Sequence, residues 1–60
     1  MKEYNYINDI GEPKRLVVYE IKNGKYPVVL WSMRTGDWCG SREMTEKELT
    51  EYLKHYNIKR

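Results

Sequence analysis

Residues 15–33 read RLVVYEIKNGKYPVVLWSM, and this stretch decides the fold that the sequence predicts. Two runs rich in β-branched and aromatic residues, 15–22 and 26–33, flank the dipeptide Asn23-Gly24. Both central residues of a type I′ turn need a positive φ, which Asn and Gly adopt readily, so this dipeptide is a strong hairpin signal. The sequence therefore predicts a β-hairpin with strands at 15–22 and 26–33.

Pro27 makes the register of this hairpin uncertain. In a hairpin with a two-residue turn, Glu20 faces Pro27 in a hydrogen-bonded pair, and proline has no N–H to complete that pair. Either one bond of the ladder is missing, or the turn is longer and the register slips. Proline also favours edge strands.

Residues 45–57 carry the signals of one amphipathic helix. The segment 45–48, TEKE, matches a capping box, in which the Thr45 hydroxyl and the Glu48 carboxylate each accept from the other's backbone N–H. Asn57 is suited to end the helix in the left-handed conformation. An apolar stripe at i, i+3, i+4 and i+7 consists of Leu49, Tyr52, Leu53 and Tyr56.

The segments on either side of the hairpin complete the expected sheet. Thr35-Gly36-Asp37 has turn chemistry, so residues 38–43 can return as a third strand with Trp38, Gly40 and Arg42 on one face. Residues 1–8 alternate loosely and form an edge strand or an arm. We expect one domain, residues 1–60, of the α+β class: a small antiparallel sheet of three to four strands with one C-terminal helix packed on one face.

Both faces of the predicted hairpin are apolar over part of their length, although one helix can cover only one face. Two explanations remain open. The N-terminal segment, with Tyr4, Tyr6, Ile7 and Ile10, folds over the second face, or that face is an interface, since Trp, Tyr and Met are enriched there. The interface hypothesis points to Val29, Trp31, Met33 and Trp38.

The sequence offers little for catalysis or for metal binding. Cys39 and His55 are the only residues of their kinds, so no internal disulfide can form and a structural zinc site lacks ligands. Their spacing matches no nucleophile and base motif. We therefore expect no enzyme, no cofactor and no small-molecule substrate. The longest run of aliphatic and aromatic residues, 28–31, is too short to span a bilayer, and no signal peptide is visible, so a cytoplasmic location is expected.

A nucleic-acid-binding module is the alternative hypothesis. The net charge is only +2, but cations on the expected strands and turns alternate with Trp and Tyr, which can stack on unpaired bases. The expected topology is similar to that of the small DNA-binding domains of phage integrases and of one class of plant transcription factors, whose sequence signatures are absent. The cations concerned are Lys14, Arg15, Lys22, Lys25, Arg34 and Arg42.

The preferred hypothesis is a small non-enzymatic binding or regulatory protein that acts through a protein partner or through self-association. It accounts together for the surplus apolar face, the aromatic side chains and the lack of catalytic residues. Chains of this kind are common among accessory proteins of phages and mobile elements that bind a host factor.

Overall fold

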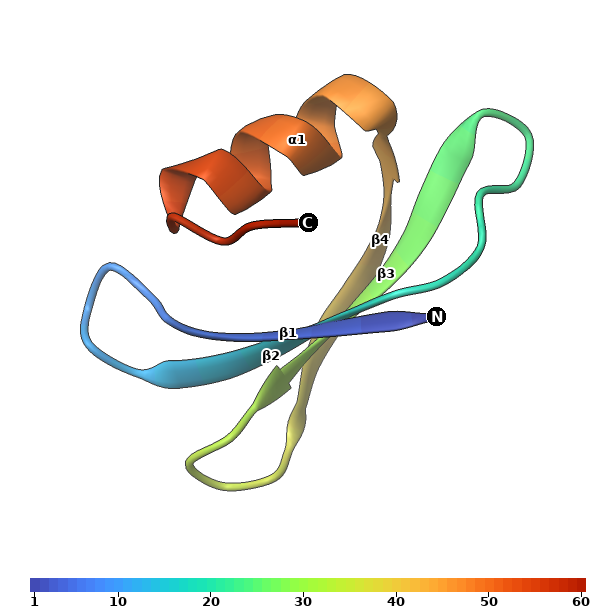
Figure 1. The fold of residues 1–60 in the computed structure, drawn as a ribbon. Coiled ribbons are helices and arrows are strands. Elements are labelled where there is room, and N and C mark those ends of the chain that lie inside the picture. The colour runs from blue at the N-terminus through green and yellow to red at the C-terminus, as the bar shows by residue number, and fades with distance from the viewer.

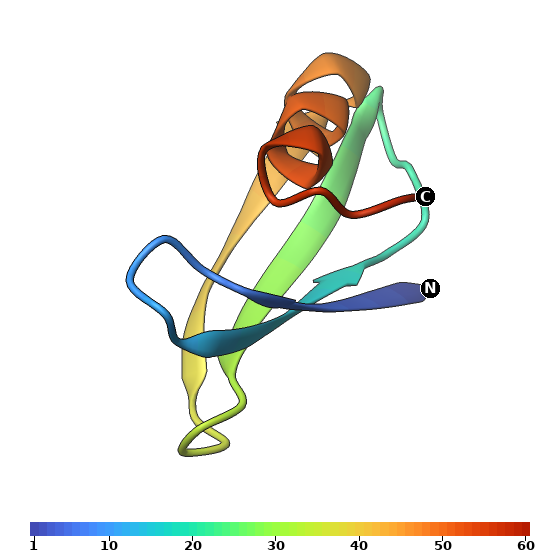
Figure 2. The same ribbon diagram turned by 60° about the vertical axis from the view of Figure 1, so that its left-hand side comes forward.

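A computed structural model describes all 60 residues as a four-stranded antiparallel sheet and a single C-terminal helix. The strands lie in the order in which they follow one another along the chain, so each pairs with its neighbour in sequence. The helix lies across one face of the sheet, and the other face is uncovered (Figures 1 and 2). The predicted α+β class is therefore confirmed. The elements are β1 (Lys2–Ile7), β2 (Pro13–Val18), β3 (Lys25–Ser32), β4 (Trp38–Thr45) and α1 (Glu46–His55).

The hairpin turn forms at Asn23-Gly24 as its sequence predicts. Asn23 has a φ of 52° and Gly24 a φ of 80°, and both residues are therefore left-handed. Lys22 and Lys25 exchange both backbone hydrogen bonds, at 2.7 and 3.1 Å. The turn therefore has two residues, and the longer turn that Pro27 left open does not occur.

The register nevertheless slips one step beyond the turn. Tyr19 N–H donates to the carbonyl of Pro27 at 2.9 Å, so Pro27 faces Tyr19 and not Glu20. Two residues, Glu20 and Ile21, therefore lie opposite the single residue Tyr26. The bulge ends β2 at Val18, earlier than predicted, and Pro27 lies in an inner strand, with its missing N–H at this break in the ladder.

The bulge decides which side chains share a face. An uninterrupted ladder from the two-residue turn would set Val18 opposite Val29. The observed pairs are Val17 with Val29 and Val18 with Val28. A shift of one residue moves every side chain of a strand to the other face relative to its partner.

A second irregularity lies between β3 and β4. Leu30 pairs with Gly40 and Trp31 pairs with Trp38, so Cys39 is an extra residue on β4. The prediction that Trp38 shares a face with Gly40 and Arg42 is therefore wrong. The extra residue turns Trp38 to the side of Trp31, away from the helix.

β1 extends the sheet at its edge and does not cover the second face. It pairs with β2 along its whole length, from Lys2 opposite Val18 to Ile7 opposite Pro13. Tyr4 and Tyr6 both point to the helix side, where Tyr6 belongs to the core and Tyr4 packs against it. Ile7 and Ile10 remain exposed. The explanation in which residues 1–10 shield the second face does not hold.

α1 begins and ends where its capping signals place it. Thr45 is the N-cap, and both hydrogen bonds of the capping box form, at 2.9 and 3.1 Å. At the C-terminus Asn57 has a φ of 58°, and Ile58 N–H donates to the carbonyl of Leu53 at 2.8 Å. This is a Schellman motif, which places Ile58 against the core. The helix itself is Glu46–His55, shorter at both ends than the predicted 45–57 because the capping residues lie outside it.

The core lies between the helix and one face of the sheet. Leu49 and Leu53 of α1 and Leu16 of β2 are almost fully buried. Met44 and Leu49 also occupy the two positions of a hydrophobic staple, which sets the angle at which the chain enters the helix. No helix is long and apolar enough to cross a membrane. The core residues are Tyr6, Leu16, Val18, Val28, Met44, Leu49 and Leu53.

Candidate functional site

The sheet surface away from α1, here called the open face, is the largest feature that the fold leaves without a covering element. The strand register gives its members, because side chains that are paired across strands point to the same side. The open face consists of Glu3, Asn5, Ile7, Pro13, Arg15, Val17, Tyr19, Lys25, Pro27, Val29, Trp31, Met33, Trp38, Ser41, Glu43 and Thr45.

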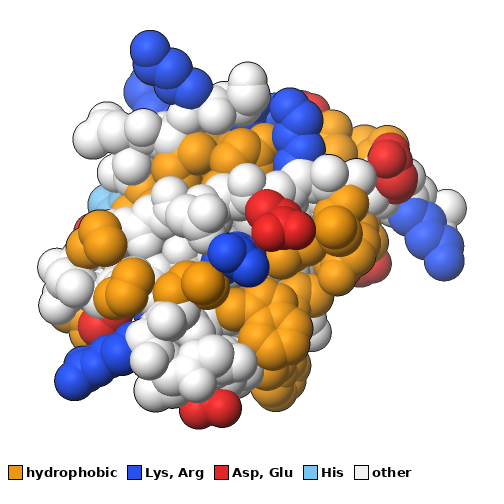
Figure 3. Space-filling view, turned by 60° about the horizontal axis from the view of Figure 1, so that its bottom comes forward, with side chains coloured by type: hydrophobic (Ala, Val, Ile, Leu, Met, Phe, Trp, Pro, Cys, Tyr) orange, Lys and Arg blue, Asp and Glu red, His pale blue; other side chains and the backbone are white.

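An apolar band crosses the open face from β2 to β4. Val17 lies opposite Val29, and Trp31 lies opposite Trp38. Trp38 is 60% exposed and Met33 is 42% exposed, while Val29 and Trp31 are half-buried. Viewed from the side that lies at the bottom of Figure 1, hydrophobic side chains cover much of the surface, with single charged groups between them (Figure 3). Water therefore contacts large side chains that a core would normally enclose.

The open face is hollowed beside Trp31. A depression of about 360 Å³ lies between the start of β1 and the end of β3. Val17 forms part of its floor and is only 6% exposed, although no helix lies over it. Its shielding comes from neighbours on the sheet. The depression is lined by Met1, Glu3, Arg15, Val17, Tyr19, Trp31, Ser32, Met33 and Gly36.

A small polar group borders the depression on β1 and β2. The Arg15 guanidinium donates to the Asn5 side-chain oxygen at 3.0 Å and lies 3.6 Å from a Glu3 carboxylate oxygen. Arg15 lies directly opposite Trp31 on β3. The open face thus combines an apolar band with a hydrogen-bonded charge pair at its side, the arrangement of a hydrophobic interface centre with a polar rim.

The structure places the four predicted interface residues, Val29, Trp31, Met33 and Trp38, on this one face. The interface hypothesis did not include Val17, Arg15 and Tyr19, which also lie on this face, and Arg15 was predicted only as a cation of the nucleic-acid alternative. Strand alternation could not assign Val17, because its partner across the hairpin depends on the bulge that Glu20 and Ile21 form. The signal that could have found it is Pro27, whose missing N–H makes a bulge at that point favourable.

The six cations of the nucleic-acid hypothesis are not gathered on one surface. Lys14 and Arg42 lie on the helix side of the sheet, and Arg15 and Lys25 lie on the side of the open face. Lys22 lies beside the Asn-Gly turn, and Arg34 lies in the β3–β4 turn. Four of them face a carboxylate within 4 Å. These pairs are Lys14–Glu12, Arg15–Glu3, Arg34–Glu12 and Arg42–Glu48.

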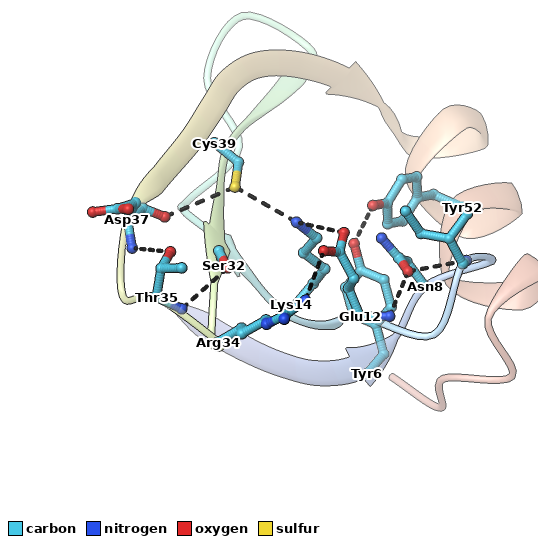
Figure 4. A network of polar contacts seen from close by, with 11 residues as sticks. Tyr6, Asn8, Glu12, Lys14, Ser32, Arg34, Thr35, Asp37, Cys39 and Tyr52 are labelled. Carbon is cyan, nitrogen blue, oxygen red and sulfur yellow. Dashed lines mark hydrogen bonds and ion pairs between the residues drawn. The ribbon is translucent and has the colours of Figure 1, made fainter.

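Cys39 and His55 each have other partners. The Cys39 thiol lies 3.7 Å from the Lys14 ammonium and 3.8 Å from the carbonyl of Asp37, at the end of the sheet where the β3–β4 turn lies (Figure 4). His55 contacts the Asp9 carboxylate at 3.1 Å, which ties the end of α1 to the loop after β1. No group of three or more His, Cys, Asp or Glu side chains is placed to hold a metal ion.

The strongest shift of a titrating group lies in the core, away from the open face. Burial, together with the Tyr52 hydroxyl to which it is hydrogen-bonded, raises the pKa of Tyr6 well above its usual value. Tyr6, Tyr52 and Tyr56 pack ring against ring, with centroids 4.5 to 6.0 Å apart. This cluster joins β1 to the helix, and packing accounts for it.

Comparison with protein-family models, with curated proteins and with solved structures finds no match to this chain.

Proposed function

We propose that this protein is a small binding module that docks another protein against the open face and thereby regulates it. The observation that carries the proposal is the uncovered pair Trp31 and Trp38, set beside Val17 and Val29 on a sheet whose other face is already packed. Tryptophan is the residue most enriched among the side chains that dominate binding energy.

The size of the open face supports a protein partner. The molecule is a slab with principal extents of 32, 22 and 15 Å, so each broad face measures about 32 by 22 Å. A standard protein interface buries roughly 800 Å² on each partner. The two larger extents enclose about 700 Å², so one broad face of this slab is close in size to one side of a standard interface.

The charges of the open face favour a protein over a nucleic acid. Among the six candidate cations only Arg15 and Lys25 lie on the side of the open face. Glu3 faces Arg15 at 3.6 Å, and Lys25 lies at the far end of β3, beside the Asn-Gly turn. A surface that binds a phosphate backbone needs several cations that are free to displace counterions. The partner that fits is an apolar protein surface with a carboxylate or amide rim opposite Arg15.

The test compares wild-type protein with Trp31→Ala as immobilised baits against the same cell extract. A protein retained by wild type alone is then purified and titrated against each variant. We expect Trp31→Ala to weaken its binding by tenfold or more, since hot-spot truncations cost about 2 kcal/mol or more. Ile10→Ala is the matched control, because it removes a side chain that is 79% exposed in the loop after β1.

Three outcomes would count against the proposal. The retained protein could bind Trp31→Ala as tightly as wild type, in a variant whose amide NMR spectrum shows that it is folded. Sedimentation could show a dimer that Trp31→Ala abolishes, and the open face would then hold a second copy. Short duplex or single-stranded DNA or RNA could shift the sheet amides with a steep salt dependence, which would establish the nucleic-acid alternative.

A further inference from the structure

The outer edge of β4 is a second surface with unsatisfied binding capacity. β4 is the last strand of the sheet, so one side of its backbone has no neighbouring strand (Figure 1). In an antiparallel strand alternate residues direct their N–H and C=O groups away from the partner strand. None of the side-chain hydrogen bonds or loop hydrogen bonds reaches the backbone of residues 40–44. These groups are therefore free to pair with an added strand.

An apolar cavity opens directly behind this edge, on the helix side. Its volume is about 230 Å³, and it lies between β4, β3 and Tyr52 of α1. A dry protein cavity of about 150 Å³ holds a benzene molecule, so this one has room for a leucine-sized side chain. Its apolar lining consists of Leu16, Val28, Leu30, Cys39, Met44 and Tyr52, and Gly40, Ser41 and Arg42 line it as well.

Gly40 keeps the cavity open toward the edge. It lines the cavity opposite Leu30, and a Cβ atom at this position would meet nothing within 4 Å. The φ of Gly40 is 151°, a conformation that residues with a side chain rarely adopt. Any other residue at this position would be strained and would place its side chain beside the mouth of the cavity.

The charged residues of β4 indicate which charges a strand added at this edge should carry. Arg42 is on the helix side of the strand, and Glu43, the next residue, is on the open face. The Arg42 side chain is 62% exposed, and its ion pair with Glu48 is long, at 3.9 Å. An incoming strand is favoured by an acidic residue opposite Arg42 and a basic residue opposite Glu43.

We propose that β4 binds an extended segment of another protein as a fifth, antiparallel strand, with one apolar side chain in the cavity behind Gly40. An antiparallel strand runs from the position opposite Glu43 to the position opposite Gly40. From its N-terminus the segment therefore reads basic, acidic, any residue, apolar. Main-chain hydrogen bonds supply affinity, and the cavity and the two charges supply selectivity.

A second copy of this chain does not fit the edge well. A two-fold axis perpendicular to the sheet would pair two β4 strands edge to edge, with the helix side of both copies on the same side of the joined sheet. Residues that are directly opposite each other point to the same face, so such an axis must pass beside one residue of β4 and pair that residue with its own copy. With the axis at Arg42, the two Arg42 side chains are directly opposite. With the axis at Ser41, they are diagonal neighbours, and like charges at either place destabilise the pairing. These two registers are the ones that use most of β4.

The experiment titrates ¹⁵N-labelled protein with the blocked synthetic peptide Thr-Lys-Glu-Thr-Leu-Thr. We expect saturable amide shifts confined to residues 39–44, Leu30 and Tyr52, with a dissociation constant of about 10 µM to 1 mM. Replacing the peptide's leucine with glycine should weaken binding about tenfold or more, because the leucine side chain leaves an apolar cavity.

The charge pair gives a reciprocal test. Arg42→Glu should weaken the peptide by about threefold to tenfold, and a peptide with lysine in place of its glutamate should recover that loss. Lys47→Glu is the matched control, since it makes the same charge change on an exposed position of α1 and should leave binding unchanged. Trp31→Ala should also leave peptide binding unchanged, so this surface and the open face succeed or fail separately.

Several results would overturn the assignment. These are no shifts at about 1 mM peptide, shifts confined to the open face, and equal binding of the leucine and glycine peptides. Concentration-dependent shifts of residues 39–44 without any peptide would show that a second copy occupies the edge instead.

Discussion

The two faces of the sheet are built from the same strands, with similar side chains, and they differ in how much of those side chains is exposed. On the helix side Leu16 and Val28 are each 2% exposed, while on the open face Trp38 is 60% exposed. Neighbouring residues of one strand divide between these two environments, as Val28 and Val29 do. The difference comes from α1, which is the only helix and lies against one face of the sheet. A run of apolar residues in the sequence therefore predicts that a face of the strand will be buried. It does not tell whether that face will be buried in the core or in an interface with another molecule.

The difference between the two faces is tested most directly by removing one large side chain from each face. Leu53→Ala should cost about 2–5 kcal/mol of unfolding free energy, because Leu53 is 1% exposed and its loss leaves a cavity. Since a domain of this size has only about 3–5 kcal/mol in total, this variant should be largely unfolded. Trp38→Ala should change stability by about 1 kcal/mol or less.

Urea unfolding followed by circular dichroism measures both variants. Met44→Leu is the control for a core position, since it conserves volume and should cost less than about 1.5 kcal/mol. If Trp38→Ala destabilised the chain as much as Leu53→Ala does, the open face would be part of the core.

Val17 and Val18 give a finer comparison, because they are 6% and 7% exposed and lie on opposite faces. Val18 packs in the core beneath α1, whereas Val17 is shielded only by neighbours on the sheet surface. Val18→Ala should cost roughly 1.5–3 kcal/mol, from two lost methyl groups and a cavity. Val17→Ala should cost about 1 kcal/mol, because the space that it leaves adjoins the depression and can be filled by water or by its partly exposed neighbours. Equal values from the same unfolding measurement would show that burial alone, without the helix, sets the cost.

The smallest expected effect concerns the polar contacts that hold the C-terminal residues on the covered side. Contacts from the Arg60 guanidinium and the hydroxyls of Tyr26 and Thr50 lower the pKa of Glu46 from its usual 4.5 to about 2. The folded state thus favours the ionised carboxylate. Its contribution to stability is present above about pH 4.5 and is lost as the pH falls through about 2.

Arg60→Gln removes the largest of these contacts. A carboxyl ¹³C titration should then show the pKa of Glu46 moved upward toward 4.5, with the open-face amide shifts unchanged. Lys59→Gln, which removes a neighbouring cation of the same tail, serves as the control. A pKa of Glu46 that stays near 2 in Arg60→Gln would mean that Arg60 does not hold the carboxylate in solution.

Local signals in the sequence predicted the turn and the helix. Asn23-Gly24 sets a two-residue turn because both residues accept a positive φ, and residues 45–48 start a helix because their side chains satisfy free backbone N–H groups. The four interface candidates also fall on one face. Alternation assigns Val29, Trp31 and Met33 to one side of their strand.

The misassigned face of Trp38 shows where that reasoning stops. Its side depends on an extra residue at Cys39, and the pairing of Val17 depends on another at Glu20 and Ile21. The alternation of side chains along one strand contains no information about the register in which that strand pairs with its neighbour. A bulge forms where two paired strands cannot continue one regular ladder, so its position depends on the sequences of both strands.

The sequence by itself determined the elements of this protein, because turns, caps and amphipathic stripes depend on residues within a few positions of one another. Only the tertiary structure decided the side on which each apolar residue lies, and that β1 extends the sheet edge instead of covering the second face. Those outcomes depend on contacts between residues far apart in the chain, such as Tyr6 with Tyr52, which determine where β1 can lie. The open face and the β4 edge follow from that placement.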